Sequence, residues 1–212
     1  MSERIAIHLR DLGEALVVAW RREFDGIASV TVSRGDIFSS KAGLVAPNDP
    51  IDIKADAVVS PANSFGFMDG GIDAVYTYQF GLGLQERLQT LIAGEHGGEL
   101  PVGAAAILPT GHSDIPWCIS APTMRVPRDV SDTVNAYLAF RAALRAVLDH
   151  NKRGLPAIRS ILCPGLGTAV GRMPVHRCAH QKRVAWDRVL GAGYTIPRSL
   201  RAVADDELDL FR

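Results

Sequence analysis

The stretch VVSPANSFGFMDGGIDAVYTYQFG, from Val58 to Gly81, decides how this 212-residue chain is read. It opens with an apolar, β-branched run that is typical of a strand covered on both faces. A turn-rich segment follows, with one asparagine, two aspartates and three glycines, and a helical pattern begins near Ile72. The stretch therefore predicts a buried strand, a polar loop and a helix whose N-terminus faces that loop.

Strands and helices alternate on both sides of this stretch, which favours a single α/β domain with helices on both faces of a sheet. Ser131 or Asp132 is expected to cap the clearest helix, and Gly154 lies beyond its end. Segment 41–55 is expected to be a surface loop, and 196–212 a short extra helix or a mobile tail. The predicted strands lie within 4–11, 29–36, 55–60, 103–111, 117–124 and 157–167, the last of which runs into a glycine-rich loop. The predicted helices cover 12–24, 72–98, 131–151 and 175–193.

The composition limits the possible partners. Twenty-three basic and 23 acidic residues give a formal net charge of zero, which makes a nucleic-acid partner unlikely. No apolar run approaches the roughly 20 residues of a membrane helix, and the N-terminus has no apolar signal region, so no membrane partner is expected. Cys118, Cys163 and Cys178 indicate reduced thiols in a cytoplasmic protein. No feature of the sequence specifies an oligomeric state.

A metal site is not expected. His176 and His180 are four residues apart and could share one face of a helix, which is a spacing used by metal ligands. Two ligands do not complete a zinc site, and Cys178 falls on another side of the helix. We therefore expect no metal and no cofactor.

Three polar or glycine-rich loops follow predicted strands: RGDIF, SPANSFGFMDGGID and CPGLGTAVGRMP. In an open α/β sheet, ligands gather beyond the carboxyl ends of the strands. Glycines there let backbone N–H groups approach an oxyanion, and the N-terminus of a following helix adds partial positive charge. These loops predict a site that binds a diphosphate without basic side chains.

Other nucleotide-binding motifs fit less well. Gly165 to Gly171 has the spacing GxGxxxG, where a dinucleotide-binding loop has GxGxxG, and no acid follows about 20 residues on. The chain contains no GxxxxGK[ST] and no GxSxG motif. These absences exclude a P-loop and a nucleophile elbow.

Three segments together resemble the macro domain family, which binds ADP-ribose. They are GDI (Gly35–Ile37), DAVVSPANS…DGGIDAVY…FG (Asp56–Gly81) and CPGLGTAVGRMP (Cys163–Pro174), in the family's order and at fitting distances. The resemblance implies a three-layer α/β/α fold with a mixed, mostly parallel central sheet. It also implies one domain over 1–212, with a core of about 30–190, an N-terminal strand–helix extension and a C-terminal tail.

The resemblance also implies roles for individual residues. Asp36 would accept a hydrogen bond from the adenine amino group, with the Ile37 backbone beside it. Asn63 and Asp73 would be the catalytic residues: Asn63 would touch the distal ribose, and Asp73 would be the acid at that ribose. The remaining ligand-binding positions are expected to surround the phosphates: Gly70, Gly71, Ile72, Gly167, Thr168, Ala169, Val170, Gly171 and Arg172.

The chemistry of Asn63 and Asp73 agrees with these roles. An Asn side chain is both donor and acceptor, so it can hold a ribose diol in one orientation. A carboxylate near the anomeric carbon can activate water or stabilise developing positive charge. Alternatively, Asn63 is a turn residue with an Asx hydrogen bond, and Asp73 is a first-turn acid that complements the helix dipole.

The sequence departs from the family pattern at several positions. Ser60 and Pro61 replace an Asn and an Ala, and Thr77 replaces a His. Gly171 replaces an aromatic residue and Arg172 a glycine. Residues close enough in sequence to substitute for the missing aromatic are Phe65, Phe67 and Tyr76.

The resulting expectation is a hydrolase that acts on ADP-ribosyl substrates. It would remove ADP-ribose from modified protein side chains or deacylate O-acetyl-ADP-ribose, so its partners would be ADP-ribose or an ADP-ribosylated substrate. Two alternatives remain: a reader module that binds ADP-ribose without chemistry, and an ADP-ribose 1″-phosphatase.

Overall fold

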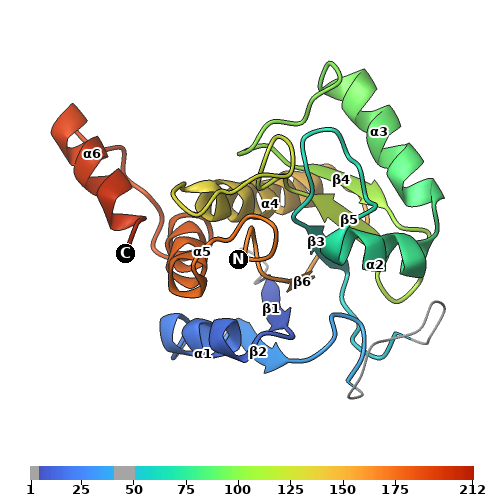
Figure 1. Ribbon diagram of the computed structural model, residues 1–212, viewed down its shortest axis with the longest axis horizontal. Helices are drawn as coiled ribbons and strands as arrows, with labels where there is room; N and C mark the ends of the chain where they lie inside the picture. Colours follow the sequence, from blue (N-terminus) through green and yellow to red (C-terminus); the bar gives the residue numbers. More distant parts are fainter. Residues whose placement is uncertain (1–4, 41–50) are drawn as a thin grey trace.

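The computed structural model describes residues 5–40 and 51–212, so most of the predicted loop over 41–55 lies outside the described residues (Figure 1). Its strands form one sheet in the order β2-β1-β6-β3-β5-β4. Neighbouring strands are parallel except for β4 and β5, which confirms a mixed, mostly parallel sheet. The strands are β1 (Ala6–Asp11), β2 (Val30–Arg34), β3 (Ala57–Ser60), β4 (Ala106–Pro109), β5 (Trp117–Ser120) and β6 (Ser160–Cys163).

Helices cover both faces of the sheet, as predicted. Every residue of β3 is buried, because Ala57 and Val59 face one hydrophobic cluster and Val58 faces the other. The first cluster lies under α1 (Glu14–Glu23), α4 (Asn135–Lys152) and α5 (Val175–Val189). The second lies under α2 (Gly71–Phe80) and α3 (Gly83–Glu95), on the right-hand side of Figure 1. The fold is therefore a three-layer α/β/α sandwich.

The N-terminal strand β1 lies inside the sheet, although the sequence resemblance placed it outside the core. Ile7 pairs with Val30 of β2 on one side and with Ile161 of β6 on the other. The helix that follows, α1, buries Leu16 and Trp20 in the first cluster. Because β1 pairs in parallel with a strand on each side, this segment is an integral part of the domain.

Two predicted helices have different bounds in the structure. The helix expected over 72–98 is two helices, because Gly81 adopts a φ of 83° and its N–H donates to the Thr77 carbonyl. Helix α4 begins only at Asn135, with Val134 as its N-cap and no side-chain cap, so the predicted capping by Ser131 or Asp132 is wrong. The Ser131 N–H instead donates to Asp129 in a preceding turn.

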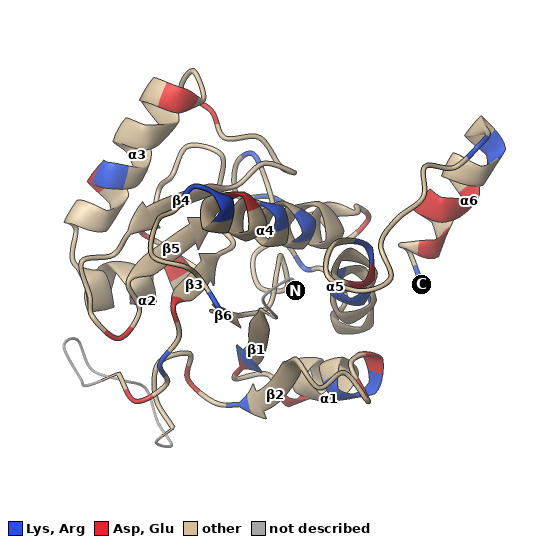
Figure 2. Ribbon diagram, turned by 180° about the vertical axis from the view of Figure 1, so that it is seen from behind, with Lys and Arg blue, Asp and Glu red and all other residues tan. Residues whose placement is uncertain are grey.

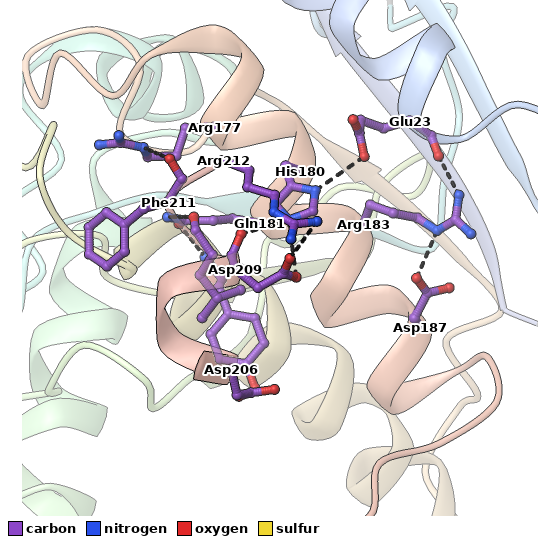
Figure 3. Close-up of polar contacts among 12 residues, drawn as sticks. Glu23, Arg177, His180, Gln181, Arg183, Asp187, Asp206, Asp209, Phe211 and Arg212 are labelled. Atoms are coloured by element: carbon purple, nitrogen blue, oxygen red, sulfur yellow. Dashed lines mark hydrogen bonds and ion pairs between the residues drawn. The ribbon is translucent and has the colours of Figure 1, made fainter. Parts of the chain in front are cut away.

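The C-terminal segment forms a helix, α6 (Leu200–Asp209), which is one of its two predicted states. Helix α6 buries none of its residues and lies apart from the sheet, beyond α5 (Figure 1). Figure 3 shows that α5 holds the end of the chain: Arg177 donates to the Phe211 carbonyl across 3.2 Å and Gln181 to the Leu210 carbonyl across 3.0 Å. His180 lies between the carboxylates of Glu23 and Asp209.

The charged residues form a mixed pattern. Figure 2 shows Lys and Arg interspersed with Asp and Glu over α1, α4, α5 and α6. Within residues 5–40 and 51–212, no helix has both the length and the apolar character needed to cross a membrane. Cys118, Cys163 and Cys178 are all buried as free thiols, as expected from the sequence.

Candidate functional site

A cavity of about 230 Å³ lies beyond the carboxyl ends of β1, β3, β5 and β6. Its walls are two loops. The first runs from Pro61 to Asp73, after β3, and the second from Pro164 to Gly171, after β6. Smaller contributions come from Asp11 after β1 and from the segment after β5, Thr123, Met124 and Pro127. The two loops that the sequence singled out thus face one another across a single cavity.

Asp73 is the acidic residue most strongly changed by its surroundings. It occupies the first turn of α2, is only 8% exposed and lines the cavity. Burial raises the pKa of its carboxyl group from 3.8 to about 7, opposed in part by a hydrogen bond from Ser60. The Ser60 hydroxyl donates to Asp73 Oδ1 across 2.5 Å. Both protonation states of Asp73 are therefore populated near neutral pH.

Asn63 lines the same cavity, but its amide is engaged by its own loop. Oδ1 accepts the N–H groups of Phe65 at 3.0 Å and Phe67 at 3.3 Å, and Nδ2 donates to the Phe67 carbonyl at 2.8 Å. These bonds are the Asx-type alternative of the sequence analysis. They hold the Phe67 side chain, which is 53% exposed, at the cavity wall. The ribose contact expected of Asn63 stays a prediction.

Gly70 and Gly71 give the first loop an open backbone. Gly70 is the N-cap of α2, and a Cβ built on either glycine meets no atom within 4 Å. Gly71 has a φ of 56°, a conformation that favours glycine. The first N–H groups of a helix have no intrahelical partner, so those of Gly71 and Ile72 can donate to a bound anion.

The glycines of the second loop have the opposite surroundings. A Cβ on Gly165 would lie 2.4 Å from Thr168 Oγ1, and a Cβ on Gly171 would lie 2.5 Å from the Gly167 carbonyl. The loop is also closed by a backbone hydrogen bond of 2.9 Å from the Met173 N–H to the Gly167 carbonyl. Thr168, Ala169, Val170 and Gly171 all line the cavity. There is no room at Gly171 for the aromatic residue that the family has there.

Three predicted ligand-binding residues do not line this cavity. Asp36 and Ile37 are buried at the end of β2, and the Asp36 carboxylate accepts the Phe38 N–H across 2.9 Å. Arg172 is exposed, has a φ of 53°, and lies 3.8 Å from the Asp129 carboxylate. The adenine contact assigned to Asp36 and Ile37 and the phosphate contact assigned to Arg172 remain predictions.

Of the three aromatic candidates, only Phe67 lines the cavity. Tyr76 is buried and donates its hydroxyl to the Val59 carbonyl across 2.9 Å. The Phe65 ring lies 4.9 Å from the Arg125 guanidinium. Thr77, at the family's His position, donates to the Met68 carbonyl across 2.7 Å and so supports the first loop.

Asp11 is a cavity residue that the sequence reasoning missed. Its Oδ1 accepts the Gly13 N–H at 2.8 Å, and its Oδ2 accepts the Gly165 N–H at 3.1 Å. It thereby connects the start of α1 to the second loop. The signal was present, because Asp11 ends a predicted strand as Asp36 does. Among the described residues, no three His, Cys, Asp or Glu side chains gather in a way that could hold a metal ion.

These features define an α/β/α ligand-binding domain whose site lies at the carboxyl ends of its parallel strands. The profile of the family described as Macro domain matches residues 59–181, which is more than half of the chain, and this chain belongs to the macro domain family. An uncharacterized protein of Aeropyrum pernix is 31% identical over 141 residues, which span 66% of this chain and 68% of that protein.

Solved macrodomains share the fold. The Oceanobacillus iheyensis macrodomain in a structure with ADP has a TM-score of 0.55 and 21% identity, over 73% of this chain and 83% of that one. The macrodomain of Mycobacterium tuberculosis DarG has a TM-score of 0.52 and 20% identity, over 69% and 91%. A variant of the Oceanobacillus protein was solved with ADP-ribose, again with a TM-score of 0.55.

Proposed function

We propose that this protein binds ADP-ribose and hydrolyses ADP-ribosyl substrates, either ADP-ribosylated protein side chains or O-acetyl-ADP-ribose. The observation that carries the proposal is the placement of Asp73, a buried carboxyl group at the cavity wall in the first turn of α2. Family membership and the ADP-ribose complex of a relative with the same fold support the choice of ligand. The buried free thiols are consistent with a location in the cytoplasm.

Each of the two loops binds one side of the ligand's diphosphate. The open backbone at Gly70 and Gly71 allows close approach of the diphosphate, and the N-terminus of α2 favours its negative charge. The second loop, through Thr168 and its neighbours, covers the other side of the phosphates. The distal ribose would then lie near Asn63, Phe67 and Asp73.

Asp73 suits acid–base chemistry at this ribose. A general acid or base works best when its pKa lies near the operating pH, and burial brings the pKa of Asp73 to about 7. Its carboxylate form can orient and deprotonate a water molecule, and its acid form can protonate the leaving group. The hydrogen bond from Ser60 fixes the orientation of the carboxyl group.

The assay measures release of free ADP-ribose from a mono-ADP-ribosylated protein and acetate release from O-acetyl-ADP-ribose, with calorimetry for ADP-ribose binding. Asp73→Ala is expected to lower turnover by about 10²–10⁴-fold while affinity for ADP-ribose changes by less than about threefold. Unchanged turnover in the variant would remove Asp73 from the mechanism. Absence of any heat with the wild-type protein would overturn the proposal as a whole.

A reader module is the second candidate, because the His and aromatic positions of the family are Thr77 and Gly171 here. Thr77 is engaged with the Met68 carbonyl, so it does not face the ligand as a proton donor. The same assay separates the candidates. Tight ADP-ribose binding without release of ADP-ribose, acetate or phosphate would identify a reader.

A further inference from the structure

Lys182 on α5 is a lysine with no exposed surface, and the proposed function gives it no role. Lysine is almost never fully buried unless its charge is paired. Within the part of the chain that the structure describes, Lys182 makes no ion pair with a carboxylate. Its Nζ lies 4.5 Å from the centre of the Trp20 ring and 5.0 Å from the centre of the Phe140 ring. The ammonium group is thus surrounded by two buried aromatic rings and the buried Cys163 thiol.

One hydrogen bond of Nζ reaches the wall of the cavity, and another joins Nζ to the buried thiol of Cys163. Nζ donates to the Pro164 carbonyl across 2.8 Å, and Pro164 is the first cavity-lining residue of the second loop. The next N–H along the chain, that of Gly165, points the other way and donates to Asp11 Oδ2 across 3.1 Å. One peptide unit therefore has an ammonium group on its oxygen side and a carboxylate on its N–H side.

This arrangement fixes the start of the second loop. A Cβ on Gly165 would meet Thr168, Leu16 and Asp11 at 2.4, 2.8 and 3.0 Å, so these side chains pack closely around Gly165. The charge of Lys182 polarises the peptide, and in a water-excluded environment its field is weakly screened. Asp11 also lines the cavity on this side. Without the positive charge of Lys182, the negative charge of Asp11 would repel an anionic ligand.

We propose that Lys182 is a positioning residue of the ligand site: it acts through the Pro164–Gly165 peptide to hold the second loop, and its buried charge favours the diphosphate of the ligand. This inference rests on the proposed binding of ADP-ribose and adds a specific electrostatic source to it. A merely structural lysine would support the fold equally for every ligand, whereas a charge acting on the phosphates discriminates ligands by their charge.

The test compares Lys182→Met, which keeps an unbranched apolar side chain and removes the ammonium group, with the wild-type protein. Calorimetry is expected to show about a tenfold or larger loss of affinity for ADP-ribose, and competition binding less than about a twofold loss for uncharged adenosine. The matched control is Lys152→Met, which removes an exposed lysine at the end of α4 and is expected to change neither affinity.

A parallel loss for both ligands, or no loss for either, in Lys182→Met would overturn the inference while leaving the proposed function intact. No binding of ADP-ribose by the wild-type protein would overturn both. A second measurement on the wild-type protein covers the case in which Lys182→Met does not fold. In Nζ-selective ¹⁵N NMR, the Lys182 resonance is expected to shift on addition of ADP-ribose and to stay in place with adenosine. Equal shifts with the two ligands would contradict a role of the charge.

Discussion

The two loops that form the cavity walls are both rich in glycine, but the glycines that line the cavity have opposite surroundings in the two loops. Around Gly70 and Gly71, an added Cβ would point into open space. At Gly165 and Gly171, it would collide with the loop itself. The first loop therefore keeps its backbone accessible to a ligand, whereas the second uses missing side chains to fold tightly. Two loops of similar composition thus have different physical roles.

The loops also differ in where they hold charge. The first loop leads into α2 and ends at the buried Asp73, while the second begins with a peptide held between Lys182 and Asp11. The first loop is expected to supply the acid–base group, and the second loop is expected to set the shape of the cavity. Four experiments test this division, beginning with the largest expected effect.

The buried carboxyl of Asp73 should make stability depend on pH. Its pKa is about 7 in the folded protein and 3.8 as a model value, so the folded state holds one more proton between these pH values. The stabilisation is complete below about pH 4, falls as the pH rises, and is lost above about pH 7, by at most about 4 kcal/mol. Asp73→Asn imitates the protonated acid and should remove this dependence.

Urea unfolding of both proteins between pH 4.5 and 8 measures the effect. The difference between wild-type and Asp73→Asn unfolding free energies should change steadily from pH 4.5 to about 7 and level off between about pH 7 and 8. A difference that stays constant with pH would mean that Asp73 is ionised throughout, and that its burial does not control its charge.

Gly171→Ala tests the tight packing of the second loop. The new Cβ would lie 2.5 Å from the Gly167 carbonyl and 2.6 Å from Val130, and the carbonyl cannot move without opening the loop. We expect a loss of about 2–3 kcal/mol in the free energy of unfolding. Chemical denaturation measures it, and a loss below about 0.5 kcal/mol would show that the loop adapts easily.

Gly70→Ala is the counterpart in the first loop. Its φ of −139° is accessible to alanine and its Cβ meets no protein atom, so stability should change by less than about 1 kcal/mol. The methyl group would instead occupy space beside the first N–H groups of α2. Affinity for ADP-ribose is expected to fall about tenfold by calorimetry. A stability loss as large as that of Gly171→Ala would erase the contrast between the loops.

Arg172→Gly is expected to have the smallest effect. Arg172 has a φ of 53°, and its ion pair with Asp129 is 3.8 Å long and exposed. Glycine relieves the strained backbone but adds entropy to the unfolded chain, so the expected gain is about 0.5 kcal/mol. Arg172→Ala removes the same side chain and keeps the strain, so thermal unfolding of this control should show no gain.

Much of the fold was predictable because the signals are local. The β-branched run before Ser60, the helical spacing of α4 and the glycines after β6 lie within single segments, and each predicted element exists in the structure. The break at Gly81 was also signalled locally, although the prediction joined α2 and α3. The N-cap of α4 was not, because Ser131 and Asp132 are part of a turn that ends only at Asn135.

The sequence by itself determined the order of strands and helices, the two loops and the candidate pair Asn63 and Asp73, since these depend on neighbouring residues. Only the tertiary structure decided what surrounds them. Insertion of β1 between β2 and β6 brings Asp11 to the cavity, and burial of α5 brings Lys182 to the second loop. Burial also moves the pKa of Asp73 towards neutrality. These properties depend on pairing and desolvation between segments far apart in the chain, which no local pattern records.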